Sequence, residues 1–214
     1  MYVPGHFAEN DSAVLHGLIR DHSFGLLISV VDGAPFATHL PFLLDTEVGA
    51  EAGPHGTLVA HMARANPHWQ AFADGVDSLV VFQGPHGYIT PSWYAPGNNV
   101  PTWNYVAVHA YGVARVIDDP AAARAVPERL TALHESGFAE PWQLADQDPR
   151  FLDGMLRGIV AFEIPIARLE GKAKLSQNKT PADRAGVIAA LATTGRADDH
   201  ALAWMMAARE DDPV

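Results

Sequence analysis

The sequence predicts a mainly β (α+β) fold, an antiparallel barrel of six strands with peripheral and C-terminal helices. Most of its strand-like stretches are joined by short turns, and antiparallel neighbours can be joined in this way. The patterns GxGxxG and GxxxxGK[ST], which form the phosphate loops of parallel α/β folds, do not occur. With 214 residues, 48% of them hydrophobic, the chain can bury a substantial core.

The strands are predicted where residues are apolar or alternate between apolar and polar. These stretches are residues 24–31, 36–44, 56–64, 78–84, 105–117 and 160–171. Asp32-Gly33 lies between the first two and predicts a tight hairpin turn. Gly112 predicts a bulge or a barrel corner in the fifth strand, and Pro165 places the sixth near a sheet edge.

Helices are predicted between the strands and after them. They cover residues 11–22, 65–75, 118–136, 149–159, 180–195 and 197–210. Asn66 and Pro67 suit the start of the second helix, and Gly75 suits its end. Pro127 is expected to break the third helix or to start a new one, because proline lacks an N–H group.

Composition narrows the classes of function. The chain has no cysteine, so it has no disulfides and no thiolate chemistry. No secretory signal precedes the first strand, and no apolar run of about 18 residues could span a membrane. We therefore expect a cytoplasmic protein. A net charge of −11 argues against direct DNA binding, which needs a basic face.

All three lysines of the chain fall within the segment EGKAKLSQNK, residues 170–179. Lys172 and Lys174 are two residues apart, so an extended backbone would point both side chains the same way. Gln177 and Asn178 add amide groups beside them. This segment suits a phosphate or an electron-rich ring edge, and the alternative is a solvated loop.

A second candidate segment is GPHGYITPSWYAPGNNVPTWNY, residues 84–105. It combines two tryptophans and three tyrosines with prolines and glycines, and it is too broken to form a single helix or strand. Such a segment serves either as packing or as the aromatic wall around a flat ligand. The candidate contacts are Ser92, Trp93, Thr102, Trp103 and Asn104.

A third candidate is Arg64, which ends a predicted strand just before the helix start at Asn66-Pro67. The guanidinium and the nearby backbone N–H groups could hold an anion, and a surface salt bridge is the alternative. The eleven histidines show no metal-binding spacing, so no metal is predicted. No Ser-His-Asp pattern is evident either, and the catalytic residues are unknown.

Six motifs follow one another along the chain: MYVPGHF, HLPFLL, HMARANPHW, VFQGPHGYITPSWY, VPTWNYVAVHAYG and EGKAKLSQNK. Together they resemble the PaiB-like FMN-binding family of negative transcriptional regulators, from residue 1 to about residue 209. The resemblance implies a split β-barrel that forms homodimers with FMN in clefts at the dimer interface. We accordingly expect a split-barrel flavin domain over residues 1–179. Residues 180–214 would form a helical extension on the barrel or on the dimer partner.

The resemblance also implies cofactor contacts. Arg64 would lie near the FMN phosphate, His61 and Met62 would line the cleft, and the SWY, TWN and KLSQN stretches would surround phosphate and ring. The full set is His61, Met62, Arg64, Ser92, Trp93, Thr102, Trp103, Asn104, Lys172, Lys174, Gln177 and Asn178.

The expected function is therefore that of a flavin-dependent redox or regulatory protein, with a small-molecule redox substrate if it is an FMN-dependent oxidoreductase. One alternative is a transcriptional regulator that acts through protein or DNA contacts without flavin chemistry. Another is a haem-binding or haem-degrading protein with His61 or His109 as the ligand.

Overall fold

A computed structural model describes residues 1–46 and 53–209 of the chain. These residues form two compact units. Unit 1 consists of Met1–Leu18, Gln83–Val108 and the residues from Glu170 onward, and unit 2 consists of Ile19–Phe82 and His109–Leu169. The predicted division at residue 179 stays a prediction. No helix in the described part of the chain has both the length and the apolar character needed to cross a bilayer.

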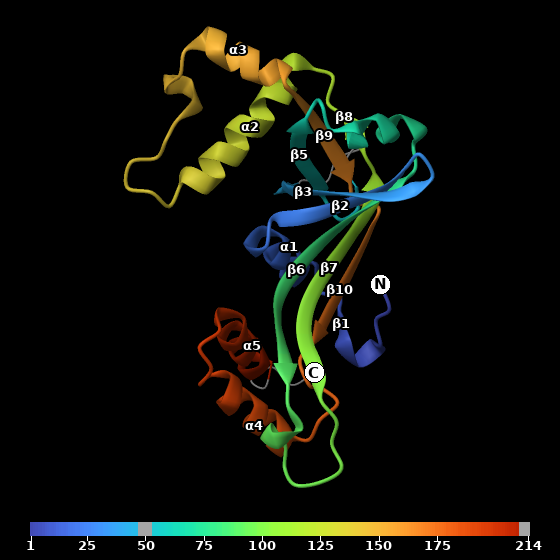
Figure 1. Ribbon diagram of the computed structural model, residues 1–214, viewed down its shortest axis with the longest axis vertical. Helices are drawn as coiled ribbons and strands as arrows, with labels where there is room; N and C mark the ends of the chain where they lie inside the picture. Colours follow the sequence, from blue (N-terminus) through green and yellow to red (C-terminus); the bar gives the residue numbers. More distant parts are fainter. Residues whose placement is uncertain (47–52, 210–214) are drawn as a thin grey trace. The chain divides into compact units, whose positions relative to one another are not determined.

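The described strands form two sheets (Figure 1). The strands are β1 (Ala8–Glu9), β2 (Phe24–Val31), β3 (Ala34–Pro41), β4 (Leu43–Asp45), β5 (Thr57–Ala63), β6 (Asp77–Ile89), β7 (Thr102–Val113), β8 (Arg115–Val116), β9 (Ile159–Pro165) and β10 (Arg168–Lys174). The six-stranded sheet has the order β1-β10-β7-β6-β2-β3, and the four-stranded sheet has the order β4-β5-β9-β8. The pairs β2–β3, β5–β9 and β1–β10 are antiparallel, and neither sheet closes on itself. The predicted fold class, a split antiparallel barrel with helices, is confirmed.

The helices follow the predicted order. They are α1 (Ser12–Asp21), α2 (Pro120–Glu135), α3 (Pro149–Arg157), α4 (Pro181–Leu191) and α5 (Ala197–Ala208), with the 3-10 helices η1 (Gly5–Phe7), η2 (Pro67–Asp74), η3 (Pro91–Trp93) and η4 (Leu144–Asp146). The Asn66 side chain accepts a hydrogen bond from the His68 N–H at the start of η2, and Gly75 ends it with a left-handed φ of 63°. The last helix was predicted to reach Glu210, which lies outside the described residues.

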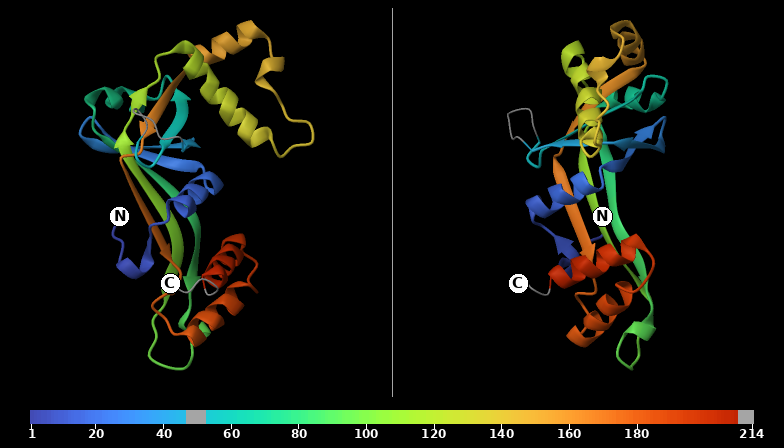
Figure 2. Two further views of the ribbon diagram at one scale, coloured as in Figure 1. Left: turned by 180° about the vertical axis from the view of Figure 1, so that it is seen from behind. Right: turned by 90° about the vertical axis from the view of Figure 1, so that its left-hand side faces the viewer.

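The core of unit 2 is aromatic. Phe162 of β9 is fully buried, and its ring centroid lies 5.1 Å from that of Phe72 and 6.3 Å from that of Phe42. Beside this core, α2 and α3 lie next to β9 (Figures 1 and 2). Burial of these large apolar side chains from strands and from η2 stabilises the unit.

Pro127 does not break its helix, so that prediction is wrong. It lies inside α2, where it cannot donate a hydrogen bond to the carbonyl of Ala123. The helix continues because Val126 and Leu130 are buried in a cluster with β-strand residues of unit 2. Packing of this apolar face outweighs the loss of one backbone hydrogen bond.

The predicted strand at 160–171 is two strands in different sheets. Pro165 ends β9, and β10 begins at Arg168. The edge prediction is also wrong, because β9 lies between β5 and β8. The sheet tolerates Pro165 because it is the last residue of its strand. Gly112 of β7 lies very close to the backbone of Pro165. A Cβ atom at position 112 would come 2.1 Å from the Pro165 carbonyl oxygen.

In unit 1, α4 and α5 pack on each other (Figure 2), and their residues Leu191 and Leu202 are fully buried. Strand β6 continues to Ile89, five residues past its predicted end at Gly84. The segment 84–105 is therefore partly a regular strand. Within β6, Gly87 allows α5 to lie close to the strand, because a Cβ atom at position 87 would lie 2.7 Å from the Asp199 Oδ1 atom of α5.

Candidate functional site

The predicted cofactor residues fall into two groups. His61, Met62 and Arg64 belong to unit 2. The remaining residues belong to unit 1, and they are Ser92, Trp93, Thr102, Trp103, Asn104, Lys172, Lys174, Gln177 and Asn178. Each group is described within its own unit.

Lys174 is the centre of the unit 1 group. It ends β10, and its Nζ atom donates hydrogen bonds to Thr102 Oγ1 at 2.5 Å and to the Trp103 carbonyl oxygen at 2.6 Å. Burial lowers the pKa of the Lys174 ammonium, and the charge of Lys172 lowers that pKa further. Two of its three ammonium protons are thus donated within the unit, and a further acceptor would stabilise the charge.

Lys172 is engaged with the N-terminal segment. It is buried, its Nζ atom donates to the Tyr2 carbonyl oxygen at 3.1 Å, and it lies 5.0 Å from the Tyr105 ring centroid. Both lysines belong to β10, which continues three residues past the predicted strand end at residue 171, so the backbone between them is extended. Lys172 thus shares the strand with Lys174 but contacts a different set of groups.

The turn after β10 is held by its own polar side chains. The Gln177 amide donates to the Ala173 carbonyl oxygen at 2.6 Å and accepts from the Leu175 N–H at 2.7 Å. Ser176 has a left-handed φ of 63°, which is uncommon for a residue with a side chain. Asn104 is fully buried, and its Nδ2 atom donates to Ser176 Oγ at 3.0 Å. Gln177 and Asn104 therefore shape the turn that follows Lys174.

A pocket of about 190 Å³ lies beside this turn. Its lining includes Thr102, Asn104, Lys174, Ser176, Asn178, Lys179, Phe7 and Tyr94. The Tyr94 side chain is 7% exposed, and its buried hydroxyl has no hydrogen-bond partner among the described residues. Lys179 Nζ lies 4.3 Å from the Tyr94 ring centroid and donates to Asn99 Oδ1 at 3.1 Å.

This pocket fits the anionic part of a ligand. A buried hydroxyl without a partner is costly, and an acceptor in the pocket would relieve that cost. Two ammonium groups beside it favour a negatively charged acceptor. Tyr94 and Lys179 were not among the predicted contacts. Lys179 could have been found, because it is the third lysine of the same segment.

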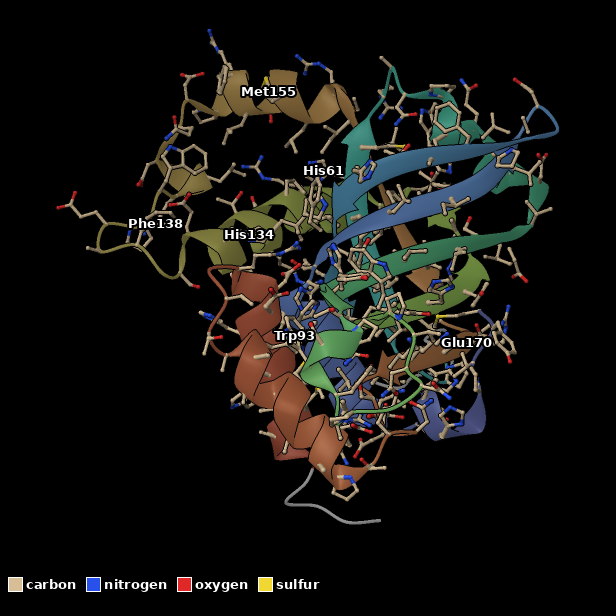
Figure 3. All side chains as sticks on the ribbon, turned by 60° about the horizontal axis from the view of Figure 1, so that its bottom comes forward. His61, Trp93, His134, Phe138, Met155 and Glu170 are labelled. Atoms are coloured by element: carbon tan, nitrogen blue, oxygen red, sulfur yellow. The ribbon has the colours of Figure 1, made fainter. Side chains whose placement is uncertain are left out.

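Three further predicted contacts, Ser92, Trp93 and Trp103, do not line this pocket. Ser92 accompanies Thr90 in the cap of η3, where their hydroxyl oxygens are 2.9 Å apart. Trp93, labelled in Figure 3, is half-buried in the same short helix. Trp103 is 48% exposed, and its ring centroid lies 5.9 Å from that of Tyr88. The exposed pair presents an aromatic surface on unit 1.

In unit 2, His61 and Met62 occupy neighbouring positions of β5 and point to opposite faces. Met62 is 2% exposed and belongs to the core. His61, labelled in Figure 3, is half-buried, and its Nδ1 atom has no hydrogen-bond partner among the described residues. Burial lowers the pKa of the His61 imidazole, so the ring is neutral at pH 7.

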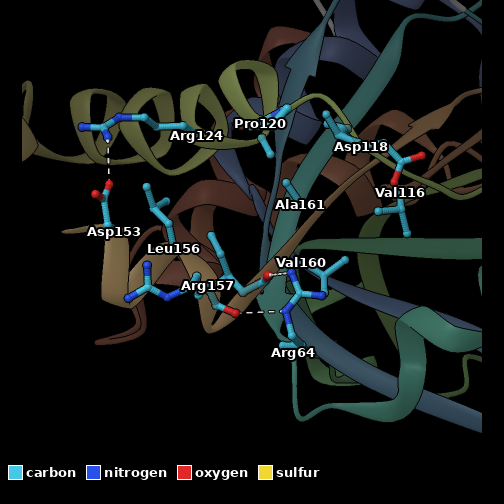
Figure 4. Close-up of a pocket in the computed structure, with 13 residues that line it drawn as sticks. Arg64, Val116, Asp118, Pro120, Arg124, Asp153, Leu156, Arg157, Val160 and Ala161 are labelled. Atoms are coloured by element: carbon cyan, nitrogen blue, oxygen red, sulfur yellow. Dashed lines mark hydrogen bonds and ion pairs between the residues drawn. The ribbon is translucent and has the colours of Figure 1, made fainter. Parts of the chain in front are cut away.

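Arg64 joins two backbone segments of unit 2 (Figure 4). Its Nε atom donates to the Arg157 carbonyl oxygen at 2.9 Å, and its Nη2 atom donates to the Ile159 carbonyl oxygen at 2.8 Å. These carbonyls lie where α3 ends and β9 begins, a position at which a cation is favoured. Arg64 also lines a larger pocket of about 530 Å³. Within residues 1–46 and 53–209, no three His, Asp or Glu side chains gather closely enough to hold a metal ion.

Lowering the pH below 6.5 is expected to destabilise the protein. His68 is fully buried, its Nδ1 atom lies 2.8 Å from Thr38 Oγ1, and burial lowers its imidazole pKa as it does for His61. The unfolded chain therefore binds protons near pH 6.5 that the folded chain binds only at lower pH. Urea unfolding at pH 7.5, 6.5 and 5.5 should show a falling free energy of unfolding. The exposed His134→Gln variant should keep this slope, and a free energy that rises toward pH 5.5 would contradict the prediction.

Two open antiparallel sheets with flanking helices place this chain in the class of split-barrel proteins to which known flavoproteins belong. The fold is similar to that of the flavocytochrome Anf3 from Azotobacter vinelandii, with a TM-score of 0.60, 14% identity and coverage of 94% of this chain and 78% of that chain. It is also similar to the FAD and heme binding protein from Mycobacterium smegmatis, with a TM-score of 0.55, 20% identity and coverage of 78% and 73%. At these identities the likeness shows the fold alone.

The sequence is similar to the "Protease synthase and sporulation protein PAI 2" of Bacillus subtilis, with 36% identity over 191 residues, which cover 88% of this chain and 87% of the relative. Residues 1–168 match the family described as "Putative FMN-binding domain". The chain belongs to this FMN-binding family. The predicted membership of the PaiB-like family is confirmed, and FMN as the cofactor is confirmed at the level of the family.

Proposed function

We propose that this chain is a homodimeric FMN-binding protein with a redox or regulatory function, and that the unit 1 pocket holds an anionic part of the cofactor. One observation carries the proposal. In a chain of net charge −11, two of its three lysines line one pocket together with a buried tyrosine hydroxyl that has no hydrogen-bond partner among the described residues. This combination is suited to a phosphate or to the electron-rich edge of a flavin ring.

When bound, FMN supplies electron and hydride transfer, which side chains alone do not provide. In this proposal Lys174 places positive charge against the anionic group, and the Tyr94 hydroxyl donates a hydrogen bond to it. Asn104 and Gln177 act indirectly, because their hydrogen bonds hold the turn that follows Lys174. Asn178 lines the same pocket.

The unit 2 residues enter the proposal through the predicted cofactor set. His61 offers a neutral ring whose buried Nδ1 atom has no partner in the described chain, and this atom can accept or donate one hydrogen bond. Arg64 anchors the end of α3 through two of its nitrogen atoms. Whether Arg64 also contacts the FMN phosphate stays a prediction, and the FMN affinity of an Arg64 variant can be compared with that of a Lys174 variant.

A regulatory role is the second candidate. It is supported by the name of the Bacillus subtilis relative, which includes sporulation. The net charge of −11 disfavours direct DNA binding, so regulation would act through flavin chemistry or a protein partner. A cytoplasmic location and a small-molecule redox substrate stay predictions.

The test is FMN titration of the purified protein, followed by absorbance spectroscopy and dialysis. We expect the protein to retain FMN and to quench its fluorescence. Analytical ultracentrifugation should give about twice the chain mass of 23.0 kDa. Unquenched FMN in a folded protein would refute flavin binding. A Soret band after haem titration would instead support the haem alternative.

A further inference from the structure

The larger pocket of unit 2 has an apolar floor. It is a pocket of about 530 Å³ between α2, α3, the start of β9 and the chain after β8. Its apolar lining includes Ile117, Ala123, Leu156, Ile159 and Val160. Small-molecule sites in proteins commonly measure roughly 300–1,000 Å³ and are lined mainly by apolar side chains. The pocket therefore has the size and the lining of a ligand site.

The charged groups at this pocket differ in what they contact. Arg124 Nε donates to Glu128 Oε1 at 2.9 Å, and Arg124 Nη1 lies 3.7 Å from Asp153 Oδ1. Arg64 donates to two backbone carbonyls. The exposed guanidinium of Arg157, by contrast, has no hydrogen-bond or ion-pair partner among residues 1–46 and 53–209.

The acidic residues do not cancel this positive charge. Asp153 faces Arg124, as the dashed line in Figure 4 marks. Asp118 lies at the opposite end of the pocket from Arg157 (Figure 4). An available guanidinium thus stands at one end of a cavity whose lining combines apolar side chains with charged ones. A guanidinium has the planar fork geometry that binds a carboxylate through two hydrogen bonds.

We propose that this pocket binds a small organic carboxylate with an apolar, ring-sized body. The carboxylate pairs with Arg157, and the body lies on the apolar floor between α2 and β9. This site goes beyond the proposed flavin function, whose principal observation lies in unit 1. Because Arg64 belongs to the predicted FMN contacts and also lines this pocket, the test must separate the two ligands.

The probe is naphthoate, and the alcohol naphthalenemethanol, which has the same ring system without the negative charge, serves as its neutral analogue. Calorimetric titration of the full chain should show naphthoate binding about ten-fold more tightly than the alcohol, as expected for a charge-assisted contact. Arg157→Gln should abolish this preference and leave binding of the alcohol unchanged. The matched control is Arg150→Gln, which removes one charge from an exposed position of α3 outside the pocket lining. This control should bind both probes as the natural protein does.

A second variant tests the cavity itself. Ala123→Leu places a larger side chain into the pocket from α2, where leucine is a good helix former, and should weaken both probes at least ten-fold. Naphthoate binding should persist in the presence of saturating FMN. Three results would each overturn the proposal: no naphthoate binding by the natural protein, full affinity in Arg157→Gln, or displacement of naphthoate by FMN. None of these results decides whether the natural protein binds FMN, because the FMN titration tests that separately.

Discussion

Gly112→Ala is expected to lower the free energy of unfolding by about 3 kcal/mol, the upper part of the range for overpacking a core. The added Cβ atom would lie 2.1 Å from the Pro165 carbonyl oxygen and 2.9 Å from Ile164 Cγ2. The first of these is a backbone atom, so no side-chain rotation removes the clash. Either β7 or the end of β9 must move. Urea unfolding measures the loss, which is a large share of a typical total of roughly 5–15 kcal/mol.

The control for this substitution is Gly17→Ala in α1. A Cβ atom at Gly17 meets no atom within 4 Å, and the residue lies inside a helix. Alanine should therefore stabilise the protein by about 0.5–1 kcal/mol. If the Gly112 and Gly17 variants changed stability equally, the close approach of β7 to Pro165 would be wrong.

Lys174→Ala is expected to weaken FMN binding by ten- to a hundred-fold, and this prediction depends on the proposed function. A hydrogen bond to a charged group contributes about 1.5–3 kcal/mol, and each 1.4 kcal/mol is a factor of ten in affinity. The substitution removes the ammonium group from the unit 1 pocket, where Tyr94 and Lys179 remain. Fluorescence titration with FMN gives the change in Kd.

Two comparisons separate this effect from unfolding and from the loss of net charge. Arg196→Ala removes one positive charge from an exposed side chain of unit 1 that lies outside the pocket lining, and should leave the affinity within two-fold. Tyr94→Phe removes only the hydroxyl, which has no hydrogen-bond partner in the described part of the chain, and should weaken FMN binding with little loss of stability. Natural affinity in a folded Lys174→Ala protein would remove Lys174 from the cofactor site.

The elements that the sequence predicts best carry local signals. Asn66, Pro67 and Gly75 are the start and stop residues of a helical turn, and η2 begins and ends beside them. The scarcity of lysine also pointed to the segment that lines the unit 1 pocket.

The differences arise where tertiary contacts outweigh local preference. Pro127 should end a helix, yet α2 continues because its apolar face is buried against unit 2 strands. Neither the sheet change at Pro165 nor the larger pocket follows from local sequence, because both depend on residues far apart in the chain. The position of Tyr94 in the pocket lining was missed for the same reason. Its buried hydroxyl is defined by neighbours such as Phe7 and Lys179, and only folding brings these together.

Because every lysine lies between residues 172 and 179, proteases that cleave after lysine can act on only one short segment of the chain. An endoprotease specific for lysine can cut the chain only in β10 and in the turn after it. Strand β10 lies between β1 and β7, so its cleavage requires the sheet to open locally. The rate of cleavage after Lys172 and Lys174 therefore reports on the opening of β10, whereas cleavage after Lys179 reports on the turn. A bound cofactor that contacts this segment would slow the digestion. Cofactor binding could then be measured without a label or a substitution in the protein.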